Sequence, residues 1–278
     1  MEEPLLTSAV RAAIAVSKRL GFEAEDAVLV HNSNRIAVRL VPCNVLARVA
    51  AEGDRRHAAF EVDVARRLGA AGCPIAPLEP RAAPRVCVQD RFAVTFWTYY
   101  DVGLSSEVAP GDYVRALGRM HDGMRTVTGV PAPHFMDRVV AARRIVGDPQ
   151  HSPGLGAAGR HLLLETLETL SGVIRLRGAR EQLLHGEPHP GNLLVTRDGA
   201  LFTDLETCCR GPIEFDVAHA PEEVGEQYPG LDRELLRDCR ILSLAIATAW
   251  RWDRRDQLPN GRSLGVEWLN QLRSALHP

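Results

Sequence analysis

The stretch that decides the fold is His185-Gly186-Glu187-Pro188-His189-Pro190-Gly191-Asn192, with Asp204 a short way further along the chain. Three of its functional side chains, Glu187, Asn192 and Asp204, offer oxygen atoms and none is a thiolate. Oxygen donors suit a hard cation such as Mg²⁺, which takes few protein carboxylates and fills its other positions with water and phosphate oxygens. Glycines permit a tight loop, and prolines restrict its motion. The stretch therefore predicts a rigid loop beside a metal site.

A predicted β-hairpin separates Asn192 from Asp204. Two apolar runs flank Arg197-Asp198-Gly199, and Asp-Gly between apolar runs is a strong hairpin signal. The hairpin places the amide and the carboxylate at the ends of paired strands. Phosphoryl transfer needs such metal ligands, a carboxylate near the attacking hydroxyl and positive charge around the phosphates. Glu187 is the candidate for the carboxylate that meets the hydroxyl.

The N-terminal half predicts a small sheet with one long helix. Apolar residues repeat at helical spacing and then give way to short β-type runs separated by turn residues, which indicates an antiparallel meander. Asp54 opens the long helix. The expected elements are a helix at 5–20, strands at 27–31, 35–41 and 45–51, a helix at 54–68, and strands at 74–78 and 91–98.

In the second half of the chain, apolar residues recur mainly at helical spacing, and Asp112 is the expected N-cap of the first helix there. We therefore predict an α+β fold with two lobes, a small sheet-and-helix lobe at residues 1–99 and a mainly helical lobe at residues 100–278. Two such lobes with a cleft between them are one way to hold a nucleotide, although architecture alone does not establish a function. The expected helices of the mainly helical lobe are 112–125, 135–146, 158–177, 231–252 and 263–276.

Composition narrows the class of protein. The formal net charge of −2 gives no general attraction to nucleic acid or to an anionic membrane. No cysteines form a C-x-x-C pair, and no apolar run is long enough to span a bilayer. We expect a reduced, cytoplasmic protein, monomeric or dimeric. Its second half is slightly more acidic than its first, which fits either a cationic substrate or an ordinary solvated surface.

The loop resembles the catalytic loop of aminoglycoside phosphotransferases and related small-molecule kinases, whose usual form is His-Gly-Asp-x-x-x-x-Asn. Asp204-Leu205-Glu206 resembles the metal-binding Asp of these enzymes, and Gly211-Pro212 with Asp216 matches the segment that follows. The resemblance implies a protein-kinase-like fold. It implies an enzyme that uses ATP or GTP with Mg²⁺ to phosphorylate a hydroxyl of a small molecule, an aminoglycoside or another antibiotic among the candidates. Asn192 and Asp204 would hold the metal, and Glu187 would act on the hydroxyl.

The resemblance also implies nucleotide-binding residues in the N-terminal half. Arg48 stands where these kinases carry the lysine that contacts the phosphates, and Glu61 matches the helix glutamate that pairs with it. Asn34 belongs to the turn that covers the phosphates. Trp97 and Tyr99 belong to the hinge segment whose backbone meets the adenine.

Two positions depart from the family pattern. Glu187 replaces the usual aspartate, and one extra methylene moves the carboxylate by ~1.5 Å. A misplacement of ~1 Å can cost about 100-fold in rate unless a retracted loop compensates. Arg48 replaces the usual lysine; Lys18, the only lysine, lies in the predicted first helix. Arginine keeps the charge, and its fork can hold phosphate and carboxylate together. Arg39 on the preceding strand is the fallback.

Several residues keep two interpretations. In the resembled family His185 and Asp216 brace the loop, although His185 could also be a general base. Glu206 is either a second metal ligand or a residue that positions the loop. The acidic run 222–226 is either a solvated face or a rim that attracts cations.

The motifs do not choose an acceptor. Metabolic kinases of the sugar, choline or homoserine type share them, and so would a nucleotide-binding protein with weak turnover. A protein kinase is disfavoured because the loop lacks His-Arg-Asp, and Asp204-Leu205-Glu206 is not Asp-Phe-Gly.

Overall fold

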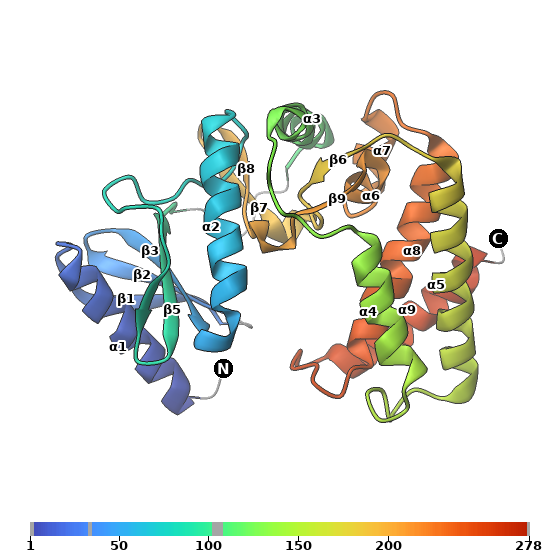
Figure 1. Ribbon diagram of the computed structural model, residues 1–278, viewed down its shortest axis with the longest axis horizontal. Helices are drawn as coiled ribbons and strands as arrows, with labels where there is room; N and C mark the ends of the chain where they lie inside the picture. Colours follow the sequence, from blue (N-terminus) through green and yellow to red (C-terminus); the bar gives the residue numbers. More distant parts are fainter. Residues whose placement is uncertain (1–2, 33–34, 102–107, 277–278) are drawn as a thin grey trace. The chain divides into compact units, whose positions relative to one another are not determined.

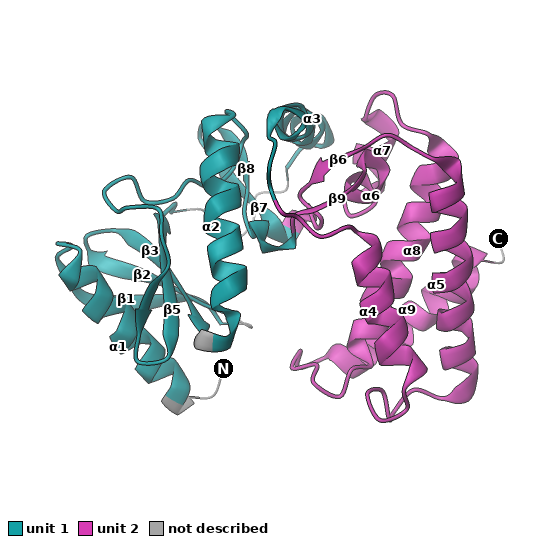
Figure 2. Cartoon of the chain, viewed as in Figure 1, with its two compact units in different colours: residues 1–130, 191–207 teal, residues 131–190, 208–278 magenta. Residues whose placement is uncertain are grey.

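The computed structural model describes residues 3–32, 35–101 and 108–276. Figure 2 shows two compact units, one made of residues 1–130 and 191–207 and the other of residues 131–190 and 208–278. The first holds an antiparallel sheet with helices, and the second is mainly helical, so the predicted α+β class is confirmed. The hairpin after the catalytic loop groups with the N-terminal sheet. The lobe boundary near residue 100 stays a prediction.

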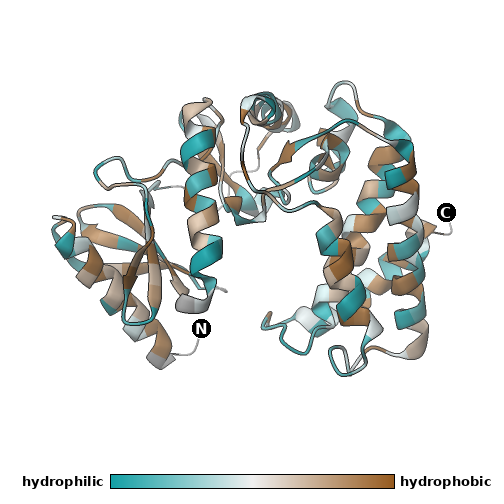
Figure 3. Ribbon diagram, viewed as in Figure 1, coloured by the Kyte–Doolittle hydropathy of each residue, from teal (hydrophilic) through white to brown (hydrophobic). Residues whose placement is uncertain are grey.

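The sheet of the first unit is an antiparallel five-stranded sheet in the order β1-β2-β3-β5-β4 (Figure 1). Alternate residues of β2, Ile36, Val38 and Leu40, are buried against apolar residues of α1, and these strands are largely brown in Figure 3. This alternation explains the strands and confirms the predicted meander. The elements are α1 (Glu3–Arg19), β1 (Ala24–Asn32), β2 (Ile36–Pro42), β3 (Val45–Ala51), β4 (Cys87–Gln89) and β5 (Phe92–Thr98).

Two further helices, α2 and α3, and a β-hairpin complete the first unit. The hairpin prediction is confirmed, with Thr196 and Gly199 as the last paired residues, so the turn itself is shorter than expected. Gly199 adopts a φ of 120°, which other residues rarely reach. The elements are α2 (Arg55–Ala70), α3 (Pro110–Thr126), β7 (Leu193–Thr196) and β8 (Gly199–Phe202).

Two local predictions for this unit are wrong. Residues 74–78 form two isolated bridges, Ile75 to Phe202 and Leu78 to Trp97, and no strand. Asp112 is not an N-cap, because α3 already begins at Pro110, whose fixed φ suits the first helical position. The predicted start of the long helix is confirmed, because Asp54 directly precedes α2.

The second unit is a helical bundle with a short two-stranded sheet. Its core packs apolar residues of α4, α5, α8 and α9 together, with Leu163, Leu242 and Leu272 among the fully buried ones. The predicted long helices are confirmed to within two residues, whereas the shorter elements were missed. The elements are α4 (Met136–Gly147), α5 (Ala157–Arg177), β6 (Glu181–Leu184), β9 (Cys209–Pro212), α6 (Ile213–Val217), α7 (Glu222–Gln227), α8 (Arg233–Arg251) and α9 (Gly261–Leu276). Among the described residues, no helix combines the length and apolar character needed to cross a membrane.

Gly211→Ala is expected to lower the free energy of unfolding by about 1–3 kcal/mol, the usual cost of overpacking. A Cβ at Gly211 in β9 would stand 2.7 Å from a ring carbon of Phe135 and 3.1 Å from a methyl of Leu184. Urea unfolding measures the change. Gly172→Ala in α5 is the control, because nothing lies within 4 Å of its added Cβ; there alanine should stabilise the helix by up to about 1 kcal/mol. Equal effects at both positions would contradict the packing argument.

Candidate active site

Arg48 on β3 connects the predicted residues of the first unit. One guanidinium nitrogen, Nη1, pairs with Glu61 Oε1 from α2, and Nη2 donates to Asp204 Oδ1 at 2.6 Å. The structure thus brings together three residues that the sequence separates widely. Because all three side chains are charged and partly or wholly buried, their hydrogen bonds are of the strong, charge-assisted kind.

Arg35, directly before β2, is a site residue that sequence reasoning missed. Its Nη1 donates to Glu61 Oε2 at 2.6 Å, and its Nη2 pairs with Glu206 Oε2. Each oxygen of Glu61 therefore receives one guanidinium, and each arginine also reaches a carboxylate of the segment 204–206. We call Arg35, Arg48, Glu61, Asp204 and Glu206 the ion-pair ring. This ion pair is compatible with the positioning role of Glu206, and both of its interpretations stay predictions.

Charge in the ion-pair ring is closely matched. Glu61 is fully buried, and a buried carboxylate without partners would be very costly. Burial acts to lower the pKa of Arg48, but the adjacent carboxylates of Glu61 and Asp204 outweigh it and raise this pKa above its ordinary value. Two arginines face three carboxylates, so the ring carries one net negative charge. Such a site suits an added cation as well as a phosphate that replaces a carboxylate.

Asn192 and Asp204 lie at the same end of the β7–β8 hairpin. The Thr203 N–H donates to the Asn192 carbonyl at 2.9 Å, which fixes the backbone directly before Asp204. Asp204 has a φ of 63°, a left-handed conformation that is uncommon outside glycine and turns the chain away from the strand. Thr207 Oγ1 donates to the Asp204 carbonyl at 3.2 Å and holds that turn.

The donor set fits Mg²⁺. Within the described residues, no group of three or more His, Cys, Asp or Glu side chains is placed to hold a metal ion. Asn192 and Asp204 offer only oxygens, the ligands that Mg²⁺ prefers, and Mg²⁺ commonly draws its remaining ligands from water and phosphate. The pair could therefore hold the ion together with nucleotide oxygens.

In the second unit, hydrogen bonds to the backbone N–H groups of the loop 185–189 hold that loop in place. Asp216 accepts hydrogen bonds from the N–H groups of His185 at 2.8 Å and Gly186 at 2.7 Å. The Glu187 N–H donates to His185 Nδ1 at 3.4 Å, and the His189 N–H donates to the Glu187 carbonyl at 2.8 Å. His185 and Asp216 are both fully buried. The bracing roles that the resemblance implied for them are what the structure shows.

Glu187 pairs with Arg138 of α4, a second residue that sequence reasoning missed. Arg138 Nη1 donates to Glu187 Oε1 at 2.9 Å and to the Gly186 carbonyl at 3.1 Å. The glutamate carboxylate is thereby tied to the backbone of its own loop. This contact restrains the Glu187 side chain, which is one methylene longer than the aspartate usual in the resembled family.

Trp97 lies on the same face of the sheet as Arg48. Its Nε1 donates to Thr95 Oγ1 at 2.9 Å, and Arg48 Cζ lies 5.8 Å from the centre of its ring. Trp97 is buried. Its side chain therefore lies beside Arg48, whereas the adenine contact expected of the hinge concerns the backbone of Trp97.

Arg39, the fallback cation, has other partners. Its Nε donates to Asn44 Oδ1 at 2.8 Å, and its guanidinium lies 4.6 Å from the centre of the Tyr99 ring. The predicted Tyr99 is thus stacked by an arginine at the end of β5. The predicted Asn34 lies outside the described residues.

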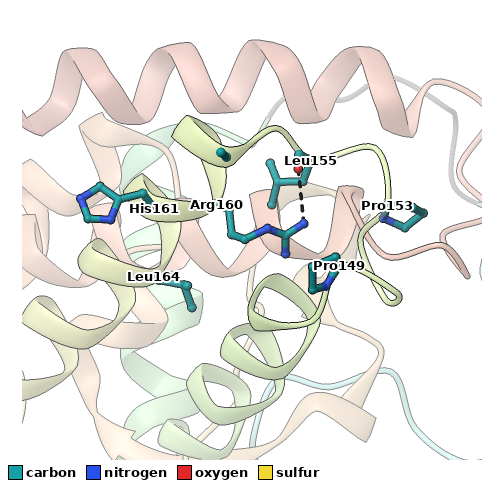
Figure 4. Close-up of a pocket in the computed structure, with 7 residues that line it drawn as sticks. Pro149, Pro153, Leu155, Arg160, His161 and Leu164 are labelled. Atoms are coloured by element: carbon teal, nitrogen blue, oxygen red, sulfur yellow. Dashed lines mark hydrogen bonds between the residues drawn. The ribbon is translucent and has the colours of Figure 1, made fainter.

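Two surface pockets lie within the second unit, and neither is lined by the loop 185–189. The larger, about 650 Å³, sits at the α4–α5 connection. There Arg160 donates to the Leu155 carbonyl at 3.3 Å (Figure 4) and also to the carbonyl and hydroxyl of Ser152. The smaller, about 290 Å³, is lined by Glu222, Glu226 and three arginines of α8. Glu222 lies 3.8 Å from Arg240, and both interpretations of the acidic run stay predictions.

His219 predicts a pH dependence of stability. Burial, reinforced by Arg138, lowers the pKa of His219 to about 3, and no residue that the structure describes forms a hydrogen bond with its Nε2. The unfolded chain binds a proton on this residue below about pH 6.5, so stability falls as the pH drops from there towards 3. We expect His219→Phe, which can keep the edge-on contact with Phe215, to remove up to ~1.4 kcal/mol of this loss per pH unit. Urea unfolding between pH 7 and 4 measures it.

The control for this prediction is His161→Gln on α5, because His161 is largely exposed. Its stability curve should parallel that of the wild type. A His219→Phe curve that also parallels the wild type would show that His219 protonates freely in the folded protein.

Comparison with known proteins places the chain in context. The model of the phosphotransferase enzyme family matches residues 22–259. No curated protein matches by sequence. Among solved structures, amicoumacin kinase hAmiN in complex with AMP-PNP, Ca²⁺ and Ami is similar with a TM-score of 0.71, 12% identity and coverage of 98% of this chain and 96% of that chain.

Two further structures share the fold. A choline/ethanolamine kinase family protein from Mesorhizobium loti has a TM-score of 0.72 at 12% identity and covers 98% of this chain and 95% of its own. Spectinomycin phosphotransferase APH(9)-Ia, with ADP and spectinomycin, has a TM-score of 0.64 at 15% identity and covers 95% and 96%. The protein-kinase-like fold that the resemblance implied is therefore confirmed.

Proposed function

The chain belongs to the phosphotransferase enzyme family, and on this premise we propose that it transfers the γ-phosphate of ATP or GTP to a hydroxyl of a small molecule. Asn192 and Asp204 would hold Mg²⁺, which when bound supplies positive charge against that of the phosphates. Arg48 would contact the phosphates while Glu61 keeps it in place. The contact between Arg48 and Asp204 carries this proposal, because it joins the cation and the metal ligand that such a site requires.

Glu187 would orient the acceptor hydroxyl and accept its proton. The acceptor oxygen forms a bond to the γ-phosphorus as the bond from that phosphorus to the bridging oxygen breaks, and ADP or GDP leaves. Arg138 would hold the carboxylate of Glu187 in position throughout. Catalysis of this kind depends on placement and charge stabilisation more than on covalent chemistry.

The acceptor is proposed only as a class. An antibiotic or an amino alcohol is suggested by the similar proteins that act on such molecules, but identities of 12–15% carry the fold and not the substrate. Antibiotic resistance is the phenotype that an antibiotic acceptor would produce. We also propose a cytoplasmic location, where ATP and Mg²⁺ are abundant. A cationic acceptor belongs to the same proposal, with the exposed glutamates of the acidic run 222–226 as a rim that would attract it; Glu222 there lies 3.8 Å from Arg240.

A coupled assay of ADP and GDP release tests the proposal. Purified protein is given ATP or GTP with Mg²⁺ and a panel of hydroxyl compounds that includes aminoglycosides, spectinomycin, choline and sugars. We expect one compound to raise nucleotide turnover well above the rate without acceptor, and Arg48→Met to abolish the increase. If neither nucleotide binds to the protein, the proposed function fails.

A nucleotide-binding protein with weak turnover is the second candidate. It is favoured by the ion pair between Glu187 and Arg138, because a carboxylate oxygen already engaged by an arginine is less available to an acceptor hydroxyl. The same panel distinguishes the two: Mg²⁺-dependent nucleotide binding without phosphorylation of any hydroxyl would support the second.

A further inference from the structure

The ion-pair ring contains one cation more than the family pattern supplies. We propose that Arg35 is a positioning residue: it fixes Glu61 and Glu206 so that Arg48 and Asp204 can exchange their mutual ion pair for nucleotide phosphate and Mg²⁺. This inference rests on the proposed function. It assigns Arg35 a role in binding that neither the family resemblance nor the loop motif includes.

The first argument is that Arg48 and Asp204 neutralise each other in the present structure. Arg48 Nη2 donates to Asp204 Oδ1 at 2.6 Å. A phosphate at Arg48 and a metal ion at Asp204 would each compete with that contact. Binding of Mg²⁺·nucleotide therefore requires this one contact of the ring to be exchanged, and the metal–phosphate pair can take its place with the same charges.

The second argument concerns what stays in place during the exchange. Glu61 is fully buried and receives one guanidinium on each oxygen. As Arg48 releases Asp204 and reorients toward a phosphate, its remaining contact with Glu61 is strained, and the 2.6 Å contact of Glu61 with Arg35 keeps this buried charge paired. A single lysine at the position of Arg48 could not share Glu61 in this way. The second arginine thus makes the exchange at the first one possible.

The third argument is the outer contact of Arg35 with Glu206. Glu206 is two residues beyond Asp204, inside the short turn 205–207 that follows it. Because Asp204 sits in a left-handed conformation, its carboxylate direction depends on how the next residues are held. Arg35 holds them from the far side of the ring. Removing the contact between Arg35 and Glu206 should therefore make Asp204 more mobile while leaving the Asp204 carboxylate itself present.

The experiment measures nucleotide affinity as a function of Mg²⁺. Isothermal titration calorimetry with AMP-PNP and GMP-PNP compares the wild type with Arg35→Met, Arg35→Lys, Glu206→Gln and the double variant Arg35→Met/Glu206→Gln. The control is Arg66→Met, because Arg66 is exposed on α2 and pairs with Asp63 at 2.8 Å outside the ring. Circular dichroism and urea unfolding establish that each variant is folded.

We expect Arg35→Met to weaken nucleotide binding by about 10–100-fold, the range for residues that hold metal ligands from behind. The half-saturating Mg²⁺ concentration should rise by about tenfold in Arg35→Met and by severalfold in Glu206→Gln. Arg35→Lys should recover part of the loss. The double variant should bind no worse than Arg35→Met, because both changes break the same contact.

Other outcomes overturn the inference. Arg35→Met that binds as tightly as the wild type at every Mg²⁺ concentration excludes a positioning role. A loss of affinity with no change in the Mg²⁺ dependence shows direct phosphate contact or general loosening instead. If Arg35→Met does not fold, Glu206→Gln decides, since Glu206 is partly exposed: an unchanged Mg²⁺ dependence there sinks the proposal. A wild type that binds neither nucleotide refutes the proposed function, and this inference with it.

Discussion

Asp204→Asn is expected to lower the rate of phosphoryl transfer by about a thousandfold or more, in line with the loss of a group that neutralises transition-state charge. The amide keeps the shape of the side chain but loses the negative charge that would bind Mg²⁺. It also weakens the contact to Arg48, which now spans 2.6 Å between two charged groups. Steady-state turnover at saturating nucleotide and Mg²⁺ measures the effect once an acceptor is known.

The matched control for this prediction is Asp198→Asn in the turn of the same hairpin. Asp198 is exposed and lies outside the ion-pair ring, so its variant should keep the wild-type rate. If Asp204→Asn retained more than a tenth of the wild-type rate, the metal ligand would have to be sought elsewhere. Equal losses in both variants would point to damage to the hairpin instead.

Glu187→Gln is expected to lower the transfer rate by about 100- to 10,000-fold, the range for loss of a general base. Nucleotide affinity should change little, because the carboxylate would act on the acceptor. Glu187→Asp restores the residue usual in the resembled family, yet we expect it to lose about 100-fold. The shorter side chain would retreat by ~1.5 Å from the position in which Arg138 now holds the carboxylate. Single-turnover phosphorylation separates this step from product release.

Glu181→Gln provides the control for the Glu187 variants. Glu181 begins β6, which leads into the catalytic loop, and its exposed carboxylate contacts His134 at 3.0 Å. Its variant should transfer phosphate at the wild-type rate. A Glu187→Asp protein faster than the wild type would show that the glutamate, with Arg138, restrains turnover and would favour the weak-turnover candidate.

The parts of the fold that were predictable are those with a local signal. The β2 and β3 strands were predictable from short β-type runs separated by turn residues. The β7–β8 hairpin was predictable from Asp198-Gly199 between apolar runs. Residues 74–78 have the same apolar character, but their neighbours in space let them form only single bridges. The four-residue strands β6 and β9 pair across about 30 residues of chain, and no window of sequence that short distinguishes a strand from a loop.

The site divides in the same way. The pairing of Arg48 with Glu61 was expected because the resemblance supplies it, and the structure shows this contact. Asp204 was expected as a metal ligand, and its contact with Arg48 had no signal in the sequence. Arg35 and Arg138 had no such signal. Arg35 reads as the start of a strand, and Arg138 as one of several arginines on a helix. Each becomes a site residue only through partners 26 and 49 positions away, a relation that periodicity and motif spacing do not contain.

The ion-pair ring finally decides which covalent reagents can report on this protein. Nucleotide analogues that acylate an amine beside the phosphates find a guanidinium at Arg48, which stays protonated and does not act as a nucleophile. The one amine-bearing side chain of the sequence, Lys18, is exposed in the last turn of α1. Amine-directed profiling of nucleotide-binding proteins would therefore pass over this chain or tag it at an uninformative position. A suitable probe is a dicarbonyl reagent that modifies arginine, used with and without nucleotide to test whether nucleotide protects Arg48 from modification.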